Sequence, residues 1–342
     1  MNDNMELYDL SQMITVPDPQ KSGKTPPKKP TKQSLGKISF TKWRKWFFLY
    51  TGICLVIGLV IILLRGFAWD TDFIGGTSMQ INIGHTLNAD DLADITEITE
   101  GIIEKKVSSV QKTGDNGDQV IIKCTEIDTE VRDAVFEALK AEYNLTDEDR
   151  LNVTSVGASV SADFRKSGIT SVALAVALML VYITIRFDFK SGVAAVFCLA
   201  HDLFFMLVAY ALFQLPMNSN VIAALLTILG YSINATIIVF DRVRENVKLY
   251  PNYTFDENMT LSSNQTLLRS VNTTVTTLLT IVMIYIFGVQ SIQQFILPLI
   301  VGIVAGLYSS VCLSGNIWAI LQKVGGKKKL PAEAEKAEKA EK

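Results

Sequence analysis

Long apolar stretches constrain this chain more than any other feature. Five of them contain at most one acidic or basic side chain, over residues 46–64, 168–185, 191–213, 221–240 and 270–322. An α-helix needs about 20 apolar residues to cross the ~30 Å hydrocarbon core of a bilayer. The first four stretches each suit one crossing, and the last is long enough for two with a turn near 288–294. The sequence therefore predicts an α-helical polytopic membrane protein with six transmembrane helices.

Charge is distributed unevenly between the segments. Over the 342 residues, 32 Lys and Arg oppose 34 Asp and Glu, and only 19% of the residues are charged, against roughly 25% in soluble domains. The segment 66–165 is strongly acidic, whereas both terminal segments are rich in lysine. This pattern excludes a soluble globular enzyme and a basic nucleic-acid-binding protein, and it indicates a membrane protein with one acidic soluble domain.

Lysine and arginine in the connections predict the orientation in the membrane. They are concentrated near both termini and in 186–190 and 241–269, and they are absent from 214–220 and 288–294. Since cytoplasmic loops carry the excess of positive charge, both termini are expected in the cytoplasm. The expected segments are a disordered basic arm (1–42), a first transmembrane helix acting as an uncleaved signal anchor (43–65), an extracytoplasmic domain (66–165), a five-helix transmembrane bundle (166–322) with a cytoplasmic loop (241–269), and a disordered Lys/Glu/Ala tail (323–342).

The segment 66–165 shows the pattern of a small α+β domain. Alternating apolar residues predict strands at 78–83, 107–112, 119–125 and 151–156. Helical spacing predicts one helix capped by Asn88 and running to about 106, and a second over 128–143. The order β-α-β-β-α-β is that of a ferredoxin-like domain.

Asp202 lies near the middle of the third apolar stretch. A charged Asp at a helix centre costs about 2.5–3.5 kcal/mol on insertion scales, so it is expected to be neutralised, paired or hydrated. Such a group can exchange a proton or an ion, and the alternative is a protonated Asp that only bonds between helices. His201 precedes it and is expected on another face of the helix, as a proton partner or as an interhelical donor.

A second group of polar residues lies on the fourth and fifth expected spans. A stripe of small and polar side chains on the fourth span is formed by Thr227, Gly230, Tyr231 and Asn234. We expect it to face Asp202, although ordinary interhelical packing would also explain it. Arg269 lies at the cytoplasmic mouth of the fifth span, where it is either a positive-inside anchor or a member of the ion site.

Signatures of enzymatic chemistry are absent from the sequence. It has no HExxH, GxSxG or P-loop pattern. Its four cysteines have no metal-binding spacing, and its two histidines are far apart. A membrane aspartyl protease needs two intramembrane carboxylates, and Asp202 is alone. We therefore expect no enzyme activity, no metal and no cofactor.

Four segments, which follow one another in the family's order along the chain, resemble the SecF subunits of the SecD/SecF family, which belongs to the resistance-nodulation-division superfamily. The segments are 72–77 (DFIGGT), 181–202 (VYITIRFDFKSGVAAVFCLAHD), 230–246 (GYSINATIIVFDRVREN) and 264–278 (NQTLLRSVNTTVTTL). The resemblance extends over about residues 40–322 and leaves out the arm and the tail.

This resemblance implies an accessory subunit of the Sec protein translocase in the cell membrane. Such a subunit pairs with SecD, docks on the SecYEG channel and helps to draw a translocating polypeptide outward at the expense of the proton motive force or another ion gradient. Asp72, Gly75 and Gly76 are expected to form a hinge at the entry to the outer domain, or else an ordinary turn. Asp241, Arg242 and Arg244 match the cytoplasmic motif of the family.

One position departs from the family pattern. In most relatives an Asp, taken to be a proton carrier, follows the Asn of the fourth span, and here that position is Ala235. Three explanations are open: the SecD partner holds the working carboxylate, Asp202 takes over with Arg269, or sodium is bound by Asp202, Asn234 and hydroxyl groups. Two other functions are also open, a half-unit of a small-molecule or lipid exporter of the same superfamily and an uncoupled membrane scaffold.

Overall fold

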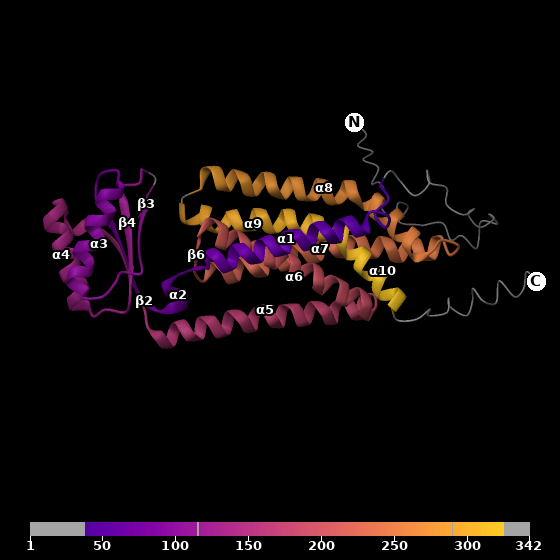
Figure 1. Ribbon diagram of the computed structural model, residues 1–342, viewed down its shortest axis with the longest axis horizontal. Coiled ribbons are helices and arrows are strands. Elements are labelled where there is room, and N and C mark those ends of the chain that lie inside the picture. Colours follow the sequence, from indigo (N-terminus) through magenta and orange to yellow (C-terminus); the bar gives the residue numbers. More distant parts are fainter. Residues whose placement is uncertain (1–37, 115, 289, 325–342) are drawn as a thin grey trace, which may run out of the picture.

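The protein consists of a bundle of long helices with a small α/β domain at one end (Figure 1). The computed structural model describes residues 38–114, 116–288 and 290–324. Six helices are long and apolar enough to cross a membrane: α1 (Arg44–Arg65), α5 (Ala158–Arg186), α6 (Phe189–Phe213), α7 (Asn220–Leu249), α8 (Phe255–Phe287) and a composite sixth span, Ile292–Val324. The sixth span joins α9 (Gln290–Tyr308), the π-helical turn η2 (Ser309–Ser314) and α10 (Gly315–Val324). The prediction of six spans is confirmed.

The end domain has the element order predicted from the sequence. Its elements are β2 (Gly76–Asn82), α3 (Ala89–Ile103), β3 (Ser109–Thr113), β4 (Gln119–Cys124), α4 (Thr129–Tyr143), the 3₁₀ turn η1 (Asp147–Asp149) and β5 (Arg150–Val156). The four strands form an antiparallel sheet in the order β3-β4-β2-β5. Helices α3 and α4 cover the face of this sheet that is turned away from the bundle (Figure 1).

Local sequence signals account for these elements. Asn88 accepts from the amides of Asp90 and Asp91, while Asp91 bonds back to the Asn88 amide, and this capping box starts α3. Alternate residues of β2 and β4 point to one side, so that side chains such as Met79, Ile81 and Ile122 are buried beneath the two helices.

A short segment joins α1 to this domain and is tied to several elements. It contains β1 (Ala68–Trp69) and α2 (Thr71–Ile74), and β1 pairs in parallel with β6 (Pro216–Met217) in the α6–α7 connection. Arg165 of α5 donates to the Phe73 carbonyl. Lys123 of β4 bonds to Asp70 at 2.8 Å. The domain is therefore fastened to the bundle through this segment.

The membrane bundle is built around α6 and the sixth span. More than half of the apolar window of each is buried, whereas the windows of α1, α5 and α8 are mostly exposed. The exposed side chains of α1 and α5 are apolar, for example Ile57 and Leu178, as expected for helices that face lipid. Gly302 of α9 lies against Ile228 of α7, where a Cβ atom would come within 2.7 Å of the Ile228 side chain, so this close approach needs glycine.

The structure corrects three predicted boundaries. The expected loop 241–269 is helical except for a short connection, because α7 runs to Leu249 and a capping box between Thr254 and Glu257 starts α8. Helix α5 begins at Ala158, inside the expected outer domain. Within the arm expected to be disordered, Phe40 is buried and Ile38 bonds to Asn264. The rest of the arm (1–37) and the tail beyond 324 lie outside the described residues.

Candidate functional site

Asp202 is completely buried where α6, α7 and the sixth span meet. Its Oδ2 accepts from the hydroxyls of Ser232 at 2.5 Å and Ser309 at 2.8 Å. Its Oδ1 lies 2.8 Å from His201 Nδ1. Both carboxylate oxygens therefore have hydrogen-bond partners, as a buried carboxylate requires.

The sixth span passes directly beside this carboxylate. At Gly306 a Cβ atom would lie 3.6 Å from Asp202 Oδ2 and 3.6 Å from the Ser232 side chain, in ordinary van der Waals contact with both. Ser309 begins the π-helical turn η2, a distortion that is frequent at functional sites. Its hydroxyl also lies 3.2 Å from the Gly306 carbonyl.

His201 belongs to the same site. The sequence places it on another helix face from Asp202, yet its Nδ1 reaches the neighbouring carboxylate. The ring is nearly buried, with the Phe205 ring centroid at 4.6 Å and that of Tyr308 at 5.9 Å. Tyr308 in turn bonds to Thr51 and to the Phe47 carbonyl, which connects the site to α1.

The expectation that the stripe on α7 faces Asp202 was wrong. Asn234, Thr227 and Gly230 are exposed, and the α7 residue that reaches Asp202 is Ser232. Both faces of α7 are largely apolar in sequence, so hydrophobic spacing could not show which one is buried. A small hydroxyl residue two positions before Asn234 is too weak a signal to have identified Ser232.

Asn234 and Arg269 instead belong to a polar surface on α7 and α8. This α7–α8 polar surface consists of Thr227, Gly230, Asn234, Arg269, Asn272, Thr273 and Thr276, all exposed. Tyr231 of α7 donates to Thr274 of α8 at 2.9 Å. Because the two helices run antiparallel, Asn234 lies about level with residue 271 along the bundle. Ala235 is half-buried beside Asn234.

The residues of the entry motif are held in place by long-range contacts. Asp72 Oδ2 accepts from the Ser219 amide at 2.8 Å, which ties the segment to the start of α7. Gly75 and Gly76 have φ of 79° and 132°, and a Cβ atom on Gly76 would lie 2.3 Å from the Cys124 carbonyl oxygen. Both glycines are therefore required by the backbone path itself.

The cytoplasmic motif makes contacts between helices. Asp241 pairs with Arg186 at 3.1 Å, and Arg244 donates to the Arg186 carbonyl at 3.1 Å, so the end of α7 holds the α5–α6 turn. Arg242 donates to Gln265 of α8 at 2.6 Å. These contacts are consistent with a role in positioning helices.

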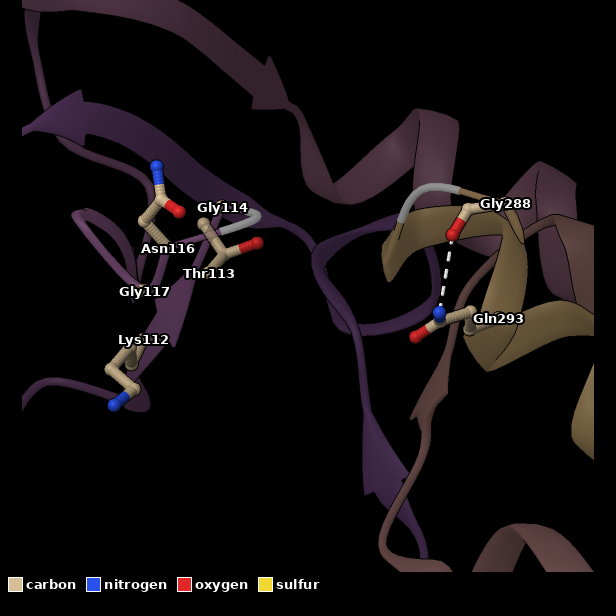
Figure 2. A pocket seen from close by; sticks show the side chains of 7 residues that line it. All are labelled: Lys112, Thr113, Gly114, Asn116, Gly117, Gly288 and Gln293. Carbon is tan, nitrogen blue, oxygen red and sulfur yellow. Dashed lines mark hydrogen bonds between the residues drawn. The ribbon is translucent and has the colours of Figure 1, made fainter. Parts of the chain in front are cut away.

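An open polar cavity of about 430 Å³ separates one corner of the end domain from the bundle (Figure 2). It lies between the β3–β4 turn and the α8–α9 connection and is lined by Lys112, Thr113, Gly114, Asn116, Gly117, Gly288 and Gln293. Among the described residues of this lining, Lys112 is the one that carries a charge. Within the described residues, no group of three or more His, Cys, Asp or Glu side chains could hold a metal ion.

The sequence is similar to a known family of membrane proteins. Residues 135–324 match the family described as "Protein export membrane protein SecD/SecF, C-terminal". Protein translocase subunit SecF of Alicyclobacillus acidocaldarius is 33% identical over 278 residues, which cover 80% of this chain and 89% of that protein. Protein translocase subunit SecDF of Bacillus subtilis is 32% identical over 286 residues, covering 82% of this chain and 38% of the relative.

A solved structure agrees with these sequence relatives. The crystal structure of SecDF from Thermus thermophilus, titled a translocon-associated membrane protein, matches with a TM-score of 0.75 and 29% identity, over 86% of this chain and 40% of that chain. The fold thus defines a multi-pass helical membrane protein with one α+β domain between its first two spans. The chain belongs to the SecD/SecF family.

Proposed function

We propose that this protein is the SecF-type subunit of a Sec protein translocase. In this role it pairs with SecD in the cell membrane and assists the ion-gradient-driven export of polypeptides. It works as an accessory subunit without catalytic chemistry of its own. Its relatives are named as translocase subunits. In the two SecDF relatives, the matched region makes up about 40% of a longer chain.

The observation that carries the proposal is the α7–α8 polar surface, which we infer to be a partner-facing surface. Its threonines are satisfied within their own helices; Thr273, for example, donates to the Arg269 carbonyl at 2.9 Å. The side chains of Asn234, Asn272 and Arg269 make no hydrogen bond or ion pair within the described part of the chain. An amide left unbonded in hydrocarbon costs about 4–8 kcal/mol. These residues therefore need a polar protein partner, in contrast to the apolar faces of α1 and α5.

A SecD-like membrane protein suits this surface. We infer that it covers α7 and α8 and supplies the carboxylate that Ala235 lacks, beside Asn234 and Arg269. A carboxyl group of the partner within ~4–6 Å of Arg269 would be stabilised in its charged form. Coupling through Asp202 with Arg269 is the second explanation, and sodium bound by Asp202, Asn234 and hydroxyl groups is the third. The exposed position of Asn234 favours the first.

The proposal includes an orientation. Both termini lie in the cytoplasm and the end domain lies outside, following the positive charge near the termini and on the α5–α6 and α7–α8 connections. There the end domain contacts the emerging polypeptide, next to the SecYEG channel on which the subunit docks. The acidic surface of this domain supports solubility outside the membrane.

Site-specific photo-crosslinking tests the pairing. A photoreactive residue at Asn234 or Asn272 should yield an adduct with a SecD-like protein in native membranes. The matched control is the same residue at Leu178, on the exposed apolar face of α5, which should yield little adduct. Co-purification of SecD and SecYEG with the tagged chain should accompany it.

The alternatives predict other results. Equal adducts from α5 and α7, or none, would refute pairing through this surface. Adducts and co-purification without any ion-gradient dependence of export would favour an uncoupled scaffold. Adducts with a membrane protein unrelated to export would favour the half-unit of a small-molecule or lipid exporter.

A further inference from the structure

We propose that the His201–Asp202 pair is a proton-binding site inside this subunit, reached from the cytoplasmic side along a seam of buried polar groups. The site is separate from the partner-facing surface, because both residues are buried and Asn234 and Arg269 lie on the exposed faces of α7 and α8. The inference rests on the proposed function only for the direction in which the bundle crosses the membrane.

The first argument is charge balance. In the apolar spans 46–64, 168–185, 191–240 and 270–322, Asp202 and His201 are the only Asp, Glu, His, Lys or Arg residues. An isolated buried anion is very costly, so the pair needs one proton or one other cation to be neutral. Within these spans, the other titratable groups on α6 and on the elements packed against it are Tyr50, Cys54, Tyr182, Cys198, Tyr210, Tyr231, Tyr308 and Cys312, and the charged residues of the same helices lie beyond the spans. Thiols and phenols are mostly uncharged near neutral pH.

The second argument is the spacing of the oxygen atoms. The Ser232 and Ser309 hydroxyl oxygens lie 2.5 and 2.8 Å from Asp202 Oδ2. A cation such as Ca²⁺, bonded to its oxygen ligands at about 2.3–2.6 Å, would have to push these oxygens apart. Hydrogen-bond spacing suits a proton. His201 Nδ1 lies 2.8 Å from Asp202 Oδ1, so the proton is shared between the imidazole and the carboxylate.

The third argument is the difference between the two halves of the bundle. On the outer side of Asp202, the core consists of apolar and aromatic side chains such as Met206, Tyr210, Ile228, Leu299 and Ile303. In the described segments 203–213, 220–230, 275–287 and 292–305, no Ser, Thr, Asn, His or charged side chain is buried. These segments of the outer half therefore offer no chain of such polar side chains along which protons could reach the site.

The inner half of the bundle contains such a route. Buried side-chain oxygens with no hydrogen-bond partner in the described structure lie on α7, α8 and α10: Thr236 Oγ1, Asn246 Oδ1, Ser263 Oγ, Ser270 Oγ and Asn316 Oδ1. Ser309, Ser310 and Ser314 on η2 are also buried and extend from Asp202 toward the same end. Buried polar atoms are normally bonded, and water fills such spare capacity where protein does not.

This polar seam reaches the inner surface. Asn246 donates to Ser262 at 2.7 Å and to Gln265 at 2.8 Å, and Gln265 is exposed. Helix α8 packs against both η2 and α10, so the polar residues of these elements share one region. A hydrated seam from Gln265 to Ser309 would connect the pair with the cytoplasm.

Infrared difference spectroscopy tests the site on the full chain in lipid nanodiscs. Spectra are compared over a series of pH values. The wild type should show a proton-uptake signal that both Asp202→Asn and His201→Gln lack. Asp241→Asn, which removes an exposed carboxylate, is the matched control and should keep the signal. The only other histidine, His85, contributes equally to every sample and cancels.

A second variant with a smaller change keeps the test valid if Asp202→Asn and His201→Gln do not fold. Ser309→Ala keeps the pair but removes one donor to the charged carboxylate, so the midpoint of the pH dependence should move. Identical difference spectra for wild type, Asp202→Asn and His201→Gln would overturn the proposal, as would an unmoved midpoint in Ser309→Ala.

Thiol labelling tests the direction of access. In a background with the four native cysteines replaced, Ser270→Cys should react with a charged, membrane-impermeant thiol reagent at least about tenfold faster in inside-out than in right-side-out vesicles. Leu178→Cys, which faces lipid, is the control and should react slowly in both. Reaction only from outside, or none, would overturn the proposed route. Absence of a SecD-like partner would refute the proposed function but leave both tests unchanged.

Discussion

The Asp70–Lys123 ion pair is one of the contacts that fasten the entry segment to the end domain. Lys123 Nζ lies 2.8 Å from Asp70 Oδ2, and the two side chains retain only 12% and 11% of their exposure. Asp70 also accepts from the Thr71 amide at 2.7 Å through Oδ1. Asp70→Asn keeps an oxygen for that amide but leaves the Lys123 charge without its partner.

The expected cost follows from this burial. Removing one partner from a fully buried ion pair costs 3–5 kcal/mol, and the small remaining exposure lowers our expectation to about 2–3 kcal/mol. At tenfold per 1.4 kcal/mol, local opening should become about 30- to 150-fold more frequent. The amides that report it are those of Ile74 and Gly75, which donate to the Asp70 and Thr71 carbonyls.

Hydrogen–deuterium exchange of the full protein measures this opening. Peptides that contain residues 73–75 should exchange faster in Asp70→Asn by about that factor. Asp70→Asn combined with Lys123→Met should recover part of the protection, because no unpaired charge remains. Lys140→Met, which breaks the more exposed pair with Asp147, is the control and should change nothing in this segment. Exchange within about twofold of wild type in Asp70→Asn would refute the reasoning.

Three further predictions concern single positions. Gly76→Ala should destabilise the end domain by about 2 kcal/mol or more in thermal unfolding, because its Cβ would clash with the Cys124 carbonyl at a positive φ. The control is Gly101→Ala in α3, where a Cβ meets nothing within 4 Å, and it should stabilise the domain by about 0.5–1 kcal/mol. Equal effects of the two substitutions would contradict this prediction. Hydrogen bonds from the Thr146 amide and hydroxyl lower the pKa of Asp149, so Asp149 adds stability above the ordinary Asp pKa of about 3.9 and loses it as the pH falls through its lowered value. Wild type and Asp149→Asn should therefore differ in melting temperature at neutral pH and converge in acid, and a gap that persists in acid would contradict this. Ala235→Asp should insert into the membrane at wild-type level, because we expect Arg269 to stabilise the new carboxylate as an anion, and loss of the protein from the membrane fraction would contradict this.

The architecture could be read from the sequence because its signals are local. The length of each apolar stretch determines a span regardless of what surrounds it. The capping box at Asn88 and the alternation in β2 and β4 likewise depend on near neighbours, and they set the order of the end domain. Asp202 could be identified as a site residue for the same reason, since a carboxylate in an apolar stretch is costly wherever its helix packs.

The partners of Asp202 could not be found in this way. In a soluble helix the apolar face is the buried face, but in a membrane both lipid and protein core accept apolar side chains. The rotation of α7 about its axis is therefore decided by close packing, such as Gly302 against Ile228. That rotation brings Ser232 to Asp202 and turns Asn234 outward.

The sequence by itself determined the six spans, the inserted α+β domain and the isolated intramembrane carboxylate. Only the tertiary structure decided that His201, Ser232 and Ser309 surround that carboxylate and that Asn234 and Arg269 belong to a separate surface. It also decided that Asp72 holds the start of α7 instead of a neighbouring amide. These contacts join residues up to 147 positions apart, and such pairings depend on how whole helices pack, which no local pattern records.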